Sequence, residues 1–328
     1  MTRAIVARAP TRLDFGGGWT DVPPYTEREG GAVCSLAITR YATATAALDE
    51  HAARRAGVGS LSDDPLTAAA LRRAGIAGAV AHVSGDFPAG SGLGGSSACG
   101  VALAGALAIL RDSPLAPNEL AALSRATEVD DLGVVGGYQD HYAAAYGGAL
   151  LLGFADYASV ELLELPGTSA DDLVRRSVLL FTGESRLSGS TVAAVRDAYV
   201  AGEPRTVAAL ARIKVLAGEM AAALRAGDID SLGRLVGEHW VHQCALHPTI
   251  TTRRIDAVVE RAKQAGALGL KALGASGGGC VLAIAEEGRE DELSAAITPL
   301  GQRLEFGIDR EGFQVIAVLD EHHGDGSG

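Results

Sequence analysis

The sequence predicts an α+β fold, because its strand and helical patterns do not alternate regularly as they would in a doubly wound parallel sheet. Residues 3–8 and 32–48 are rich in β-branched and alternating apolar residues, a pattern typical of strands. Helical patterns instead fill residues 190–226, 228–243 and 252–266, separated by short breaks that contain glycine, proline or aspartate. With 328 residues, of which 48% are hydrophobic, the chain can bury the core of one large or two medium domains.

The remaining elements are predicted from local start and stop signals. A helical pattern covers residues 51–75, and the strand pattern that follows it ends at Pro88. Small and apolar residues indicate a buried helix over 96–110, and a second helix is predicted over 116–131 with Asn118 as its N-cap. Further strands are predicted over 148–154, 158–165 and 177–183, followed by a strand–glycine turn–strand unit over 269–285.

A turn-rich stretch, LPGTSADD, begins at Leu165 and marks the predicted domain boundary. It divides the chain into residues 1–165 and residues 166–328. Strand patterns prevail before this stretch, and most of the helical patterns follow it.

The composition argues against nucleic-acid and membrane partners. A net charge of −12, without a basic run longer than two residues, argues against nucleic-acid binding. The first residues lack the apolar core of a signal peptide, and the longest apolar run, about 13 residues, is shorter than the roughly 20 that span a bilayer. The four cysteines lie far apart without CxxC spacing and are interpreted as reduced thiols. We therefore expect a cytoplasmic monomer or homodimer that binds neither nucleic acid nor membrane.

The segment PAGSGLGGSSACG, residues 88–100, contains five glycines and three serines. Its glycines satisfy the G-x-G-x-x-G dinucleotide pattern, but the acidic residue that this pattern needs about twenty residues later is replaced by the turn SPLAPNEL. A Walker A motif is excluded, because no Lys-Ser or Lys-Thr follows the glycines. A different phosphate loop is the preferred interpretation, with the glycine backbone around a polyphosphate and the helix N-terminus facing its charge. The alternative is an N-cap pair, Ser96 and Ser97, in a tight strand–helix turn.

Three segments together resemble the motifs of the GHMP kinases, the superfamily of galactokinase, homoserine kinase, mevalonate kinase and phosphomevalonate kinase. PAGSGLGGSSA at residues 88–98 is similar to the second motif, and KALGASGGGC at residues 271–280 is similar to the third. ARAPTRLDFGGGWTDVPPY at residues 7–25 resembles the first motif, onto whose positions fall Ala9, Pro10, Arg12, Thr20 and Asp21. Galactokinases carry Glu-His before Thr-Asp, whereas this chain has Gly18-Trp19. The string GGGWTDVPPY is instead similar to the corresponding segment of the bacterial heptose-7-phosphate kinases and the fucokinases.

A fourth segment, TEVDDLGVVGGYQDHYAAAYGG, resembles the part of these kinases that carries the catalytic carboxylate. Asp140 falls on the aspartate of the family's Asp-Gln pair, and His141 stands where glutamine is usual. Glu128 falls on the glutamate that binds Mg²⁺. The alternative for each acid is a solvated helix face, which is the preferred interpretation for Asp130 and Asp131.

The resemblance implies the two-domain GHMP kinase fold, with a ribosomal S5 domain 2-like N-terminal domain and a ferredoxin-like α/β sandwich at the C-terminus. It implies ATP and Mg²⁺ as cofactors, bound with the acceptor in the cleft between the domains. Asp140 would take the proton of the acceptor hydroxyl, and Arg12 would stabilise the transferring phosphoryl group. Ser96 and Glu128 would bind Mg²⁺. The implied phosphate-binding residues are Gly90, Ser91, Gly92, Leu93, Gly94, Gly95, Ser96 and Ser97. The second glycine turn would bring Gly274, Gly277 and Gly278 to the active site. The residues implied to contact the acceptor are Arg12, Thr20, Asp21, Asp140 and Arg186.

The resemblance also limits the acceptor. Heptose, fucose and galactose kinases phosphorylate the anomeric C1 hydroxyl, so it implies a sugar 1-phosphate product for nucleotide-sugar synthesis. Arg186, beside Ser185 and Ser188, would bind the phosphate of a heptose 7-phosphate, the preferred acceptor, although a surface role explains this arginine equally well. The alternatives are a fucokinase or other hexose 1-kinase, a non-catalytic ATP- or sugar-binding regulator of the same fold, an isoprenoid or amino-acid kinase, and an NAD-dependent oxidoreductase.

Overall fold

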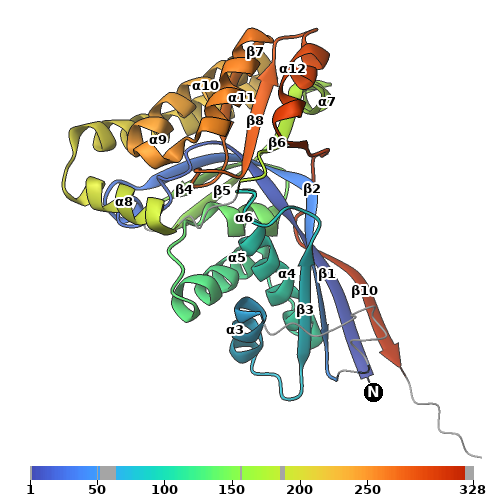
Figure 1. Cartoon of the computed structure of the whole chain (residues 1–328). Helices are drawn as coiled ribbons and strands as arrows, with labels where there is room; N and C mark the ends of the chain where they lie inside the picture. Colours follow the sequence, from blue (N-terminus) through green and yellow to red (C-terminus); the bar gives the residue numbers. More distant parts are fainter. Residues whose placement is uncertain (1, 50, 52–63, 156, 185–188, 322–328) are drawn as a thin grey trace, which may run out of the picture.

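Two antiparallel sheets with helices packed on them make up the computed structural model, which describes residues 2–49, 51, 64–155, 157–184 and 189–321 (Figure 1). This arrangement confirms the predicted α+β class, because the strands are joined by hairpins and long excursions rather than by regular βαβ units. None of the helices in these ranges is both long and apolar enough to cross a bilayer.

The first sheet is built around two long strands, β1 and β2, which pair with each other from Ala4↔Ala47 to Gly16↔Cys34. The predicted strand at residues 3–8 therefore continues to Gly16. The other side of β2 pairs with β4 near its start and with β3 near its end. The last strand of the chain, β10, was not predicted; it pairs with β1 at the sheet edge. The six strands are β1 (Thr2–Gly16), β2 (Gly31–Ala47), β3 (Val80–Gly85), β4 (Ala149–Phe154), β5 (Ala158–Leu163) and β10 (Gln314–Glu321).

One face of this sheet is covered by α4 (Gly95–Leu110), and the buried helix predicted over 96–110 is confirmed. Alanine and glycine make up much of α4, so it packs closely against β1 and β2 and is buried on nearly all sides. The second predicted helix begins at Pro117, with Ala116 rather than Asn118 as its N-cap, and ends in a π-helical turn. Of the helical pattern predicted over residues 51–75, residues 65–74 are helical and residues 52–63 lie outside the described ranges. The other elements of this half are α1 (Tyr25–Glu29), α3 (Pro65–Ala74), α5 (Pro117–Ala126), η1 (Thr127–Asp131) and α6 (Gln139–Tyr146).

The second sheet has the strand order β7-β8-β6-β9. The strand–glycine turn–strand unit predicted over 269–285 forms its first two strands, β7 and β8. Its strands are β6 (Ser177–Phe181), β7 (Ala267–Ala272), β8 (Cys280–Ala285) and β9 (Gln302–Arg303). The helices of this half are α7 (Ser169–Arg176), α8 (Gly189–Val200), α9 (Pro204–Ala226), α10 (Ile229–Leu246), η2 (Pro248–Ile250), α11 (Arg253–Gln264), α12 (Glu290–Ile297) and η3 (Thr298–Leu300).

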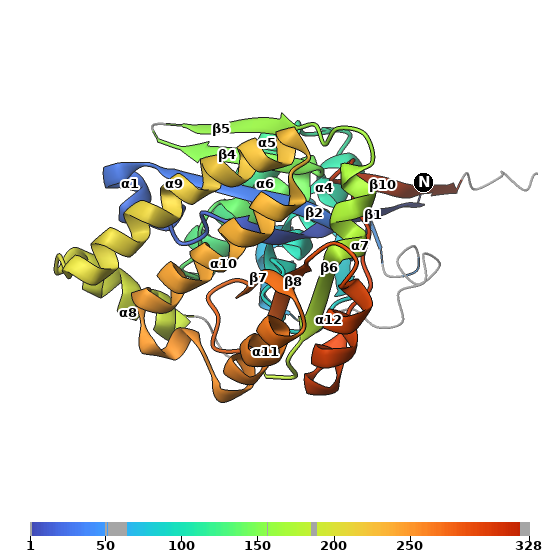
Figure 2. The same ribbon diagram turned by 90° about the horizontal axis from the view of Figure 1, so that it is seen from above.

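The antiparallel pair α9 and α10 joins the two sheets. Seen from above, both helices run across the long strands (Figure 2); α9 packs on β1 and β2, and α10 packs on β7. Their apolar faces share one core with both sheets, which includes Leu13, Leu36, Met220 and Leu282. The boundary at residue 165 stays a prediction: the first sheet precedes it and the second follows it, but β10 returns to the first sheet.

Candidate active site

The glycine-rich segment forms a loop between β3 and the N-terminus of α4. Gly90, Gly92 and Gly94 all have positive φ, a conformation that glycine adopts without the strain of a side chain. Gly94 is the N-cap of α4, and no side chain caps this helix end. The first backbone N–H groups of a sixteen-residue helix therefore face the loop, which is the geometry that favours an anion. Leu93 differs from the other residues of the loop, because its side chain is buried in the hydrophobic core. Its backbone carbonyl accepts a hydrogen bond from the backbone N–H of Arg12 at 3.0 Å.

The second glycine turn, between β7 and β8, packs directly on this loop. The Cys280 N–H donates to the Ser91 carbonyl at 2.7 Å. A Cβ on Gly92 would lie 2.6 Å from the Leu273 carbonyl oxygen, and one on Gly274 would lie 3.1 Å from the Gly92 Cα. The two turns can therefore meet only as glycines. Gly274 and Gly278 line the same cavity as the glycine-rich loop, whereas Gly277 donates its N–H to the Ile250 carbonyl at 2.8 Å.

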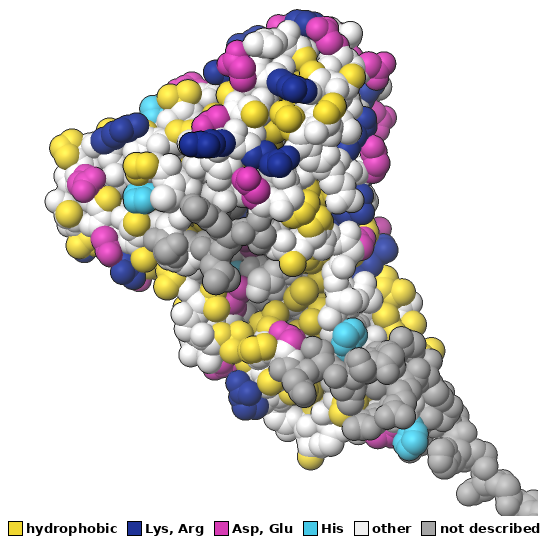
Figure 3. Space-filling model, viewed as in Figure 1, with side chains coloured by type: hydrophobic (Ala, Val, Ile, Leu, Met, Phe, Trp, Pro, Cys, Tyr) yellow, Lys and Arg dark blue, Asp and Glu magenta, His cyan; other side chains and the backbone are white. Residues whose placement is uncertain are grey.

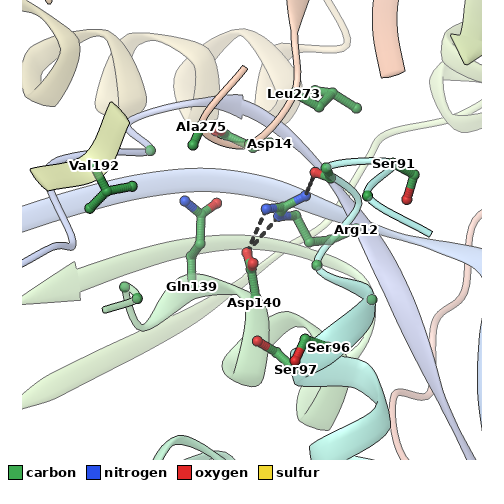
Figure 4. Close-up of a pocket in the computed structure, with 18 of the residues that line it drawn as sticks. Arg12, Asp14, Ser91, Ser96, Ser97, Gln139, Asp140, Val192, Leu273 and Ala275 are labelled. Carbon is green, nitrogen blue, oxygen red and sulfur yellow. Dashed lines mark hydrogen bonds and ion pairs between the residues drawn. The ribbon is translucent and has the colours of Figure 1, made fainter. Parts of the chain in front are cut away.

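Arg12 and Asp140 meet at the mouth of the glycine-rich loop (Figure 4). Arg12 comes from β1, and Asp140 lies in the first turn of α6. The guanidinium donates from Nε to Asp140 Oδ1 at 2.7 Å and from Nη1 to the Gly92 carbonyl at 2.6 Å. Arg12 is buried, whereas the side chain of Asp140 is 27% exposed toward the cavity. The arginine thus fixes the carboxylate while leaving it open to a ligand.

A second carboxylate, Glu128, faces the start of α4. Ser96 Oγ donates to Glu128 Oε1 at 2.6 Å, and Ser97 Oγ donates to Oε2 at 3.1 Å. Glu128 lies in the π-helical turn, a local irregularity frequent at functional sites. Burial raises the pKa of Glu128, but hydrogen bonds from His141, Ser96 and Ser97 outweigh it, and the net pKa is lowered. An ionised carboxylate beside a serine hydroxyl offers the hard oxygen ligands that Mg²⁺ prefers.

His141 explains how Glu128 is held, a role that the sequence did not indicate. Its Nε2 lies 3.2 Å from Glu128 Oε2, and its Nδ1 is 2.9 Å from Ser124 Oγ. The imidazole is buried between α4, α5 and α6. The side chain that departs from the family's Asp-Gln pair therefore supports the Glu128 carboxylate, and it belongs to the lining of the same cavity.

Asp21 and Thr20 occupy the turn after β1 and have different surroundings. Asp21 lines the cavity, and its Oδ2 accepts from the backbone N–H groups of Tyr138 and Gln139 at 2.9 and 3.0 Å. Burial raises the pKa of Asp21 to about 6, against the lowering effect of these hydrogen bonds. The Thr20 hydroxyl is fully buried; it donates to the Gly17 carbonyl at 2.7 Å and accepts from the Ala32 N–H at 3.1 Å. Thr20 therefore holds the turn and is absent from the cavity lining, so the acceptor contact that the motif implied for it stays a prediction. Arg186, the other implied acceptor contact, lies outside the described residues.

A buried ion pair that the sequence reasoning missed closes the back of the cavity. Lys271 Nζ donates to Asp14 Oδ2 at 2.9 Å, and neither side chain is exposed by more than 4%. Burial raises the pKa of Asp14, but Lys271, His239 and Arg12 outweigh it and the net pKa is lowered. Burial lowers the pKa of Lys271, against the raising effect of Asp14. The signal in the sequence was the single lysine inside the apolar strand GLKAL, since an unpaired buried lysine is strongly unfavourable.

These groups line one cavity of about 420 Å³. It lies where the loops of the first half meet the glycine turn of the second, and the space-filling view shows the molecule narrowing between α9–α12 and α3–α5 (Figure 3). Of the residues that the sequence singled out, the cavity lining includes Arg12, Asp21, Gly90, Ser91, Gly92, Gly94, Gly95, Ser96, Ser97, Glu128, Asp140, Gly274 and Gly278.

Comparison with known proteins gives consistent matches. Residues 65–148 match the family described as GHMP kinases N terminal domain, and residues 220–299 match GHMP kinases C terminal. The chain is 30% identical over 234 residues to a D-glycero-alpha-D-manno-heptose 7-phosphate kinase of Campylobacter jejuni, which covers 70% of this chain and 68% of that protein. It is 28% identical to an L-fucokinase/L-fucose-1-P guanylyltransferase of Bacteroides fragilis, over 95% of this chain but only 38% of that longer protein.

The fold comparison points the same way. The crystal structure of a D-glycero-D-manno-heptose 1-phosphate kinase from Bacteroides thetaiotaomicron superposes with a TM-score of 0.74 at 25% identity. The match covers 98% of this chain and 100% of that structure.

Proposed function

The chain belongs to the GHMP kinase family, and from this membership we propose that it transfers the γ-phosphoryl group of ATP to the anomeric C1 hydroxyl of a sugar, in the first place a heptose 7-phosphate. As a member of this family it is a phosphotransferase with an alcohol group as acceptor and ATP as phosphate donor. The observation that carries the proposal is the Arg12–Asp140 pair at the mouth of the phosphate loop. A pure binding protein has no need of a carboxylate that is fixed by arginine and still open to the cavity.

The residues present fit the triphosphate of ATP. Gly92 and Gly94 lie at positions where a Cβ would collide with the Leu273 carbonyl or approach Asp140 within 3.0 Å, so the backbone itself forms the wall. The uncapped N-terminus of α4 supplies N–H groups and the positive end of the helix dipole. In our proposal Gly90, Ser91 and Gly92 through Ser97 bind the phosphates through this backbone.

Ser96 and Glu128 fit Mg²⁺, because they bring a hydroxyl and an ionised carboxylate together at 2.6 Å. Bound there, Mg²⁺ would neutralise charge on the phosphates during transfer. His141 keeps Glu128 in position from the buried side.

Asp140 acts as the base in this proposal. It accepts the proton of the acceptor hydroxyl as that oxygen bonds to phosphorus, and ADP leaves. Arg12 orients Asp140 through Nε and stabilises the negative charge of the transferring group through its remaining donors. Asp21, which lines the same cavity, contacts the acceptor.

Two candidate acceptors follow from the relatives. The heptose 7-phosphate is supported by the matches to heptose-phosphate kinases, which include a match over nearly the whole chain. L-Fucose is the second candidate, because the alignment with the fucokinase covers 95% of this chain. The two acceptors differ in charge: the heptose 7-phosphate carries a phosphate group of its own into the cavity, in addition to those of ATP, whereas L-fucose carries none.

The experiment is an ADP-release assay with Mg²⁺ and ATP against five sugars: D-glycero-D-manno-heptose 7-phosphate, sedoheptulose 7-phosphate, D-mannose, L-fucose and D-galactose. It is run beside Asp140→Asn, which keeps the shape and removes the base. Asp130→Asn is the control, because Asp130 has a 64% exposed side chain outside the cavity. Turnover on one sugar that is lost with Asp140→Asn and kept with Asp130→Asn supports the kinase and names its acceptor. If ATP binds and no sugar releases ADP, the sugar assignment is overturned.

A further inference from the structure

Three buried side chains that line the cavity each have a polar atom without a partner in the described part of the chain. Asp14, Gln139 and Trp19 line this cavity and are exposed by only 3%, 7% and 8%. Asp14 Oδ1, Gln139 Oε1 and Trp19 Nε1 have no hydrogen-bond partner among the described residues. Buried polar atoms are nearly always paired, so three orphaned atoms around one cavity indicate a missing ligand. We propose that they form the subsite that binds the non-reacting hydroxyl groups of the acceptor, an inference that rests on the proposed function and goes beyond it by adding Asp14, Gln139 and Trp19.

Asp14 is held as a fixed hydrogen-bond acceptor. Its Oδ2 receives the Lys271 ammonium at 2.9 Å, which leaves Oδ1 for another donor. Lys271, His239 and Arg12 together lower the pKa of Asp14 against the effect of burial, so this carboxylate is ionised and can only accept. Lys271 is fully buried and comes from β7 in the second sheet. Because its ammonium holds Asp14 of β1 in place, it acts as a positioning residue for that carboxylate.

Gln139 lies on the other side of Gly18. A Cβ on Gly18 would be 2.3 Å from Asp14 Oδ2 and 2.9 Å from Gln139 Nε2, so glycine is what allows both side chains to approach. The Gln139 amide donates from Nε2 to Asp21 Oδ1 at 3.4 Å. This orientation leaves Oε1 as a second acceptor, and Figure 4 shows the side chain standing beside Asp140.

Trp19 supplies the donor. Its φ is 83°, a conformation that is strained for a bulky residue and that persists in functional sites where the surroundings impose it. The indole is buried in the wall of the cavity with Nε1 unpartnered by the part of the chain that the structure describes.

Two acceptors and one donor match hydroxyl groups, which both donate and accept. An ionised phosphate has no proton to donate to Asp14 or Gln139, and it would be repelled by the Asp14 charge. The subsite therefore takes sugar hydroxyls, and phosphate groups bind elsewhere in the cavity.

The test measures sugar binding without phosphoryl transfer. The chain has two tryptophans, so Trp240→Phe leaves Trp19 as the only indole reporter. Each of the five sugars is titrated into this variant without ATP, with the Kd taken from calorimetry and the location from Trp19 emission. We expect saturable binding of one sugar with a change in that emission. Gln139→Met should raise its Kd about tenfold, and Asp14→Asn combined with Lys271→Met should raise it by about tenfold to a hundredfold, because a hydrogen bond to a charged group is lost.

The double variant removes both charges, so that no unpaired ion is left buried. Asp230→Asn is the control: it breaks an ion pair with buried Arg176 that lies outside the cavity, and it should leave sugar binding unchanged. The Kd for ATP should also stay within twofold in every variant. Unchanged sugar affinity in Gln139→Met and in the double variant, or an equal loss of ATP affinity, overturns the subsite.

The outcomes separate this inference from the proposed function. Sugar binding that depends on Asp14 and Gln139, without ADP release, supports the subsite and overturns the kinase assignment for that sugar. ADP release with sugar binding that is indifferent to both residues overturns the subsite alone. If no sugar binds and none is turned over, both are overturned.

Discussion

Arg12 donates from both Nε and Nη2 to the same carboxylate oxygen of Asp140, each at 2.7 Å, although 128 residues separate the two in the chain. One oxygen of Asp140 is thus taken by the arginine, and the other is left toward the cavity. The remaining nitrogen, Nη1, donates to the Gly92 carbonyl and so connects this pair to the glycine-rich loop. The proposed base, the proposed charge stabiliser and the loop therefore form one rigid unit.

Replacing Arg12 tests that unit. Arg12→Lys keeps a positive charge but lacks the planar guanidinium that reaches Asp140 through Nε and Nη2 and Gly92 through Nη1, so we expect kcat to fall by about 10²- to 10³-fold, as for loss of a transition-state donor. Arg12→Met should lower kcat further and should also destabilise the fold, because Asp140 and the Gly92 carbonyl lose their hydrogen-bond donor. Steady-state ADP release and thermal unfolding check this. A kcat of Arg12→Lys near that of the original chain would contradict the role.

Replacing Glu128 tests the proposed Mg²⁺ site. Glu128→Gln removes the charge while keeping the shape, so the Mg²⁺ concentration for half-maximal activity should rise by at least about tenfold. Activity titrated with Mg²⁺ after treatment with a chelator measures this. Asp130→Asn is a matched control in the same π-helical turn, since its side chain is 64% exposed, and its Mg²⁺ dependence should not change. Equal Mg²⁺ curves for both variants would remove Glu128 from the site.

The pKa of Asp21 predicts a dependence of stability on pH. The unfolded chain loses the Asp21 proton near its ordinary pKa of 3.8, whereas the folded protein keeps it to about pH 6. The folded state therefore binds more protons between these values, and the Asp21 contribution to stability is lost as pH rises through this window. The difference between the two pKa values corresponds to about 3 kcal/mol.

Asp21→Asn removes this ionisation, and its Oδ1 can still accept from the backbone N–H groups of Tyr138 and Gln139, while its Nδ2 finds an acceptor in Oε1 once the Gln139 amide turns over. The difference in the free energy of unfolding, Asp21→Asn minus the original chain, should therefore increase from pH 4 to pH 6 and stay constant at higher pH. Urea unfolding at a series of pH values measures the difference. A difference that does not vary with pH would contradict the raised pKa.

The contact between the two glycine turns can be tested at Gly92. Gly92→Ala adds a Cβ at positive φ and 2.6 Å from the Leu273 carbonyl, so it should force the turns apart and abolish most ATP binding. Gly75→Ala is the control, because Gly75 also has positive φ but no atom lies within 4 Å of its Cβ position. The control should lose only about 1–2 kcal/mol of stability and keep its ATP affinity. Equal effects of the two substitutions would mean that backbone strain alone, rather than the collision, is responsible.

Local patterns in the sequence predicted much of the fold. The apolar run of α4, the glycine turn before it and the hairpin of β7 and β8 depend on residue size and φ preference over a few neighbours, and they lie where the sequence placed them. The strand β10 was missed, because its place depends on an edge of β1 that lies more than 300 residues away in the chain. The short helix α6, which carries Asp140, was missed as well, since eight residues give little periodic signal.

The sequence by itself determined several of the groups that line the cavity, because motif residues such as Arg12, Asp140 and Glu128 are recognised by their order and spacing, but it did not indicate Asp14 or Gln139. Only the tertiary structure decided how they are used. In the folded chain the Thr20 hydroxyl hydrogen-bonds to the backbone of Gly17 and Ala32, whereas Asp21 lines the cavity. Asp14 pairs with Lys271, which lies 257 residues away in the chain. Such pairs are set by which side chains become buried together when the two sheets close on α9 and α10. A buried charge must find its partner there, wherever that partner lies in the chain.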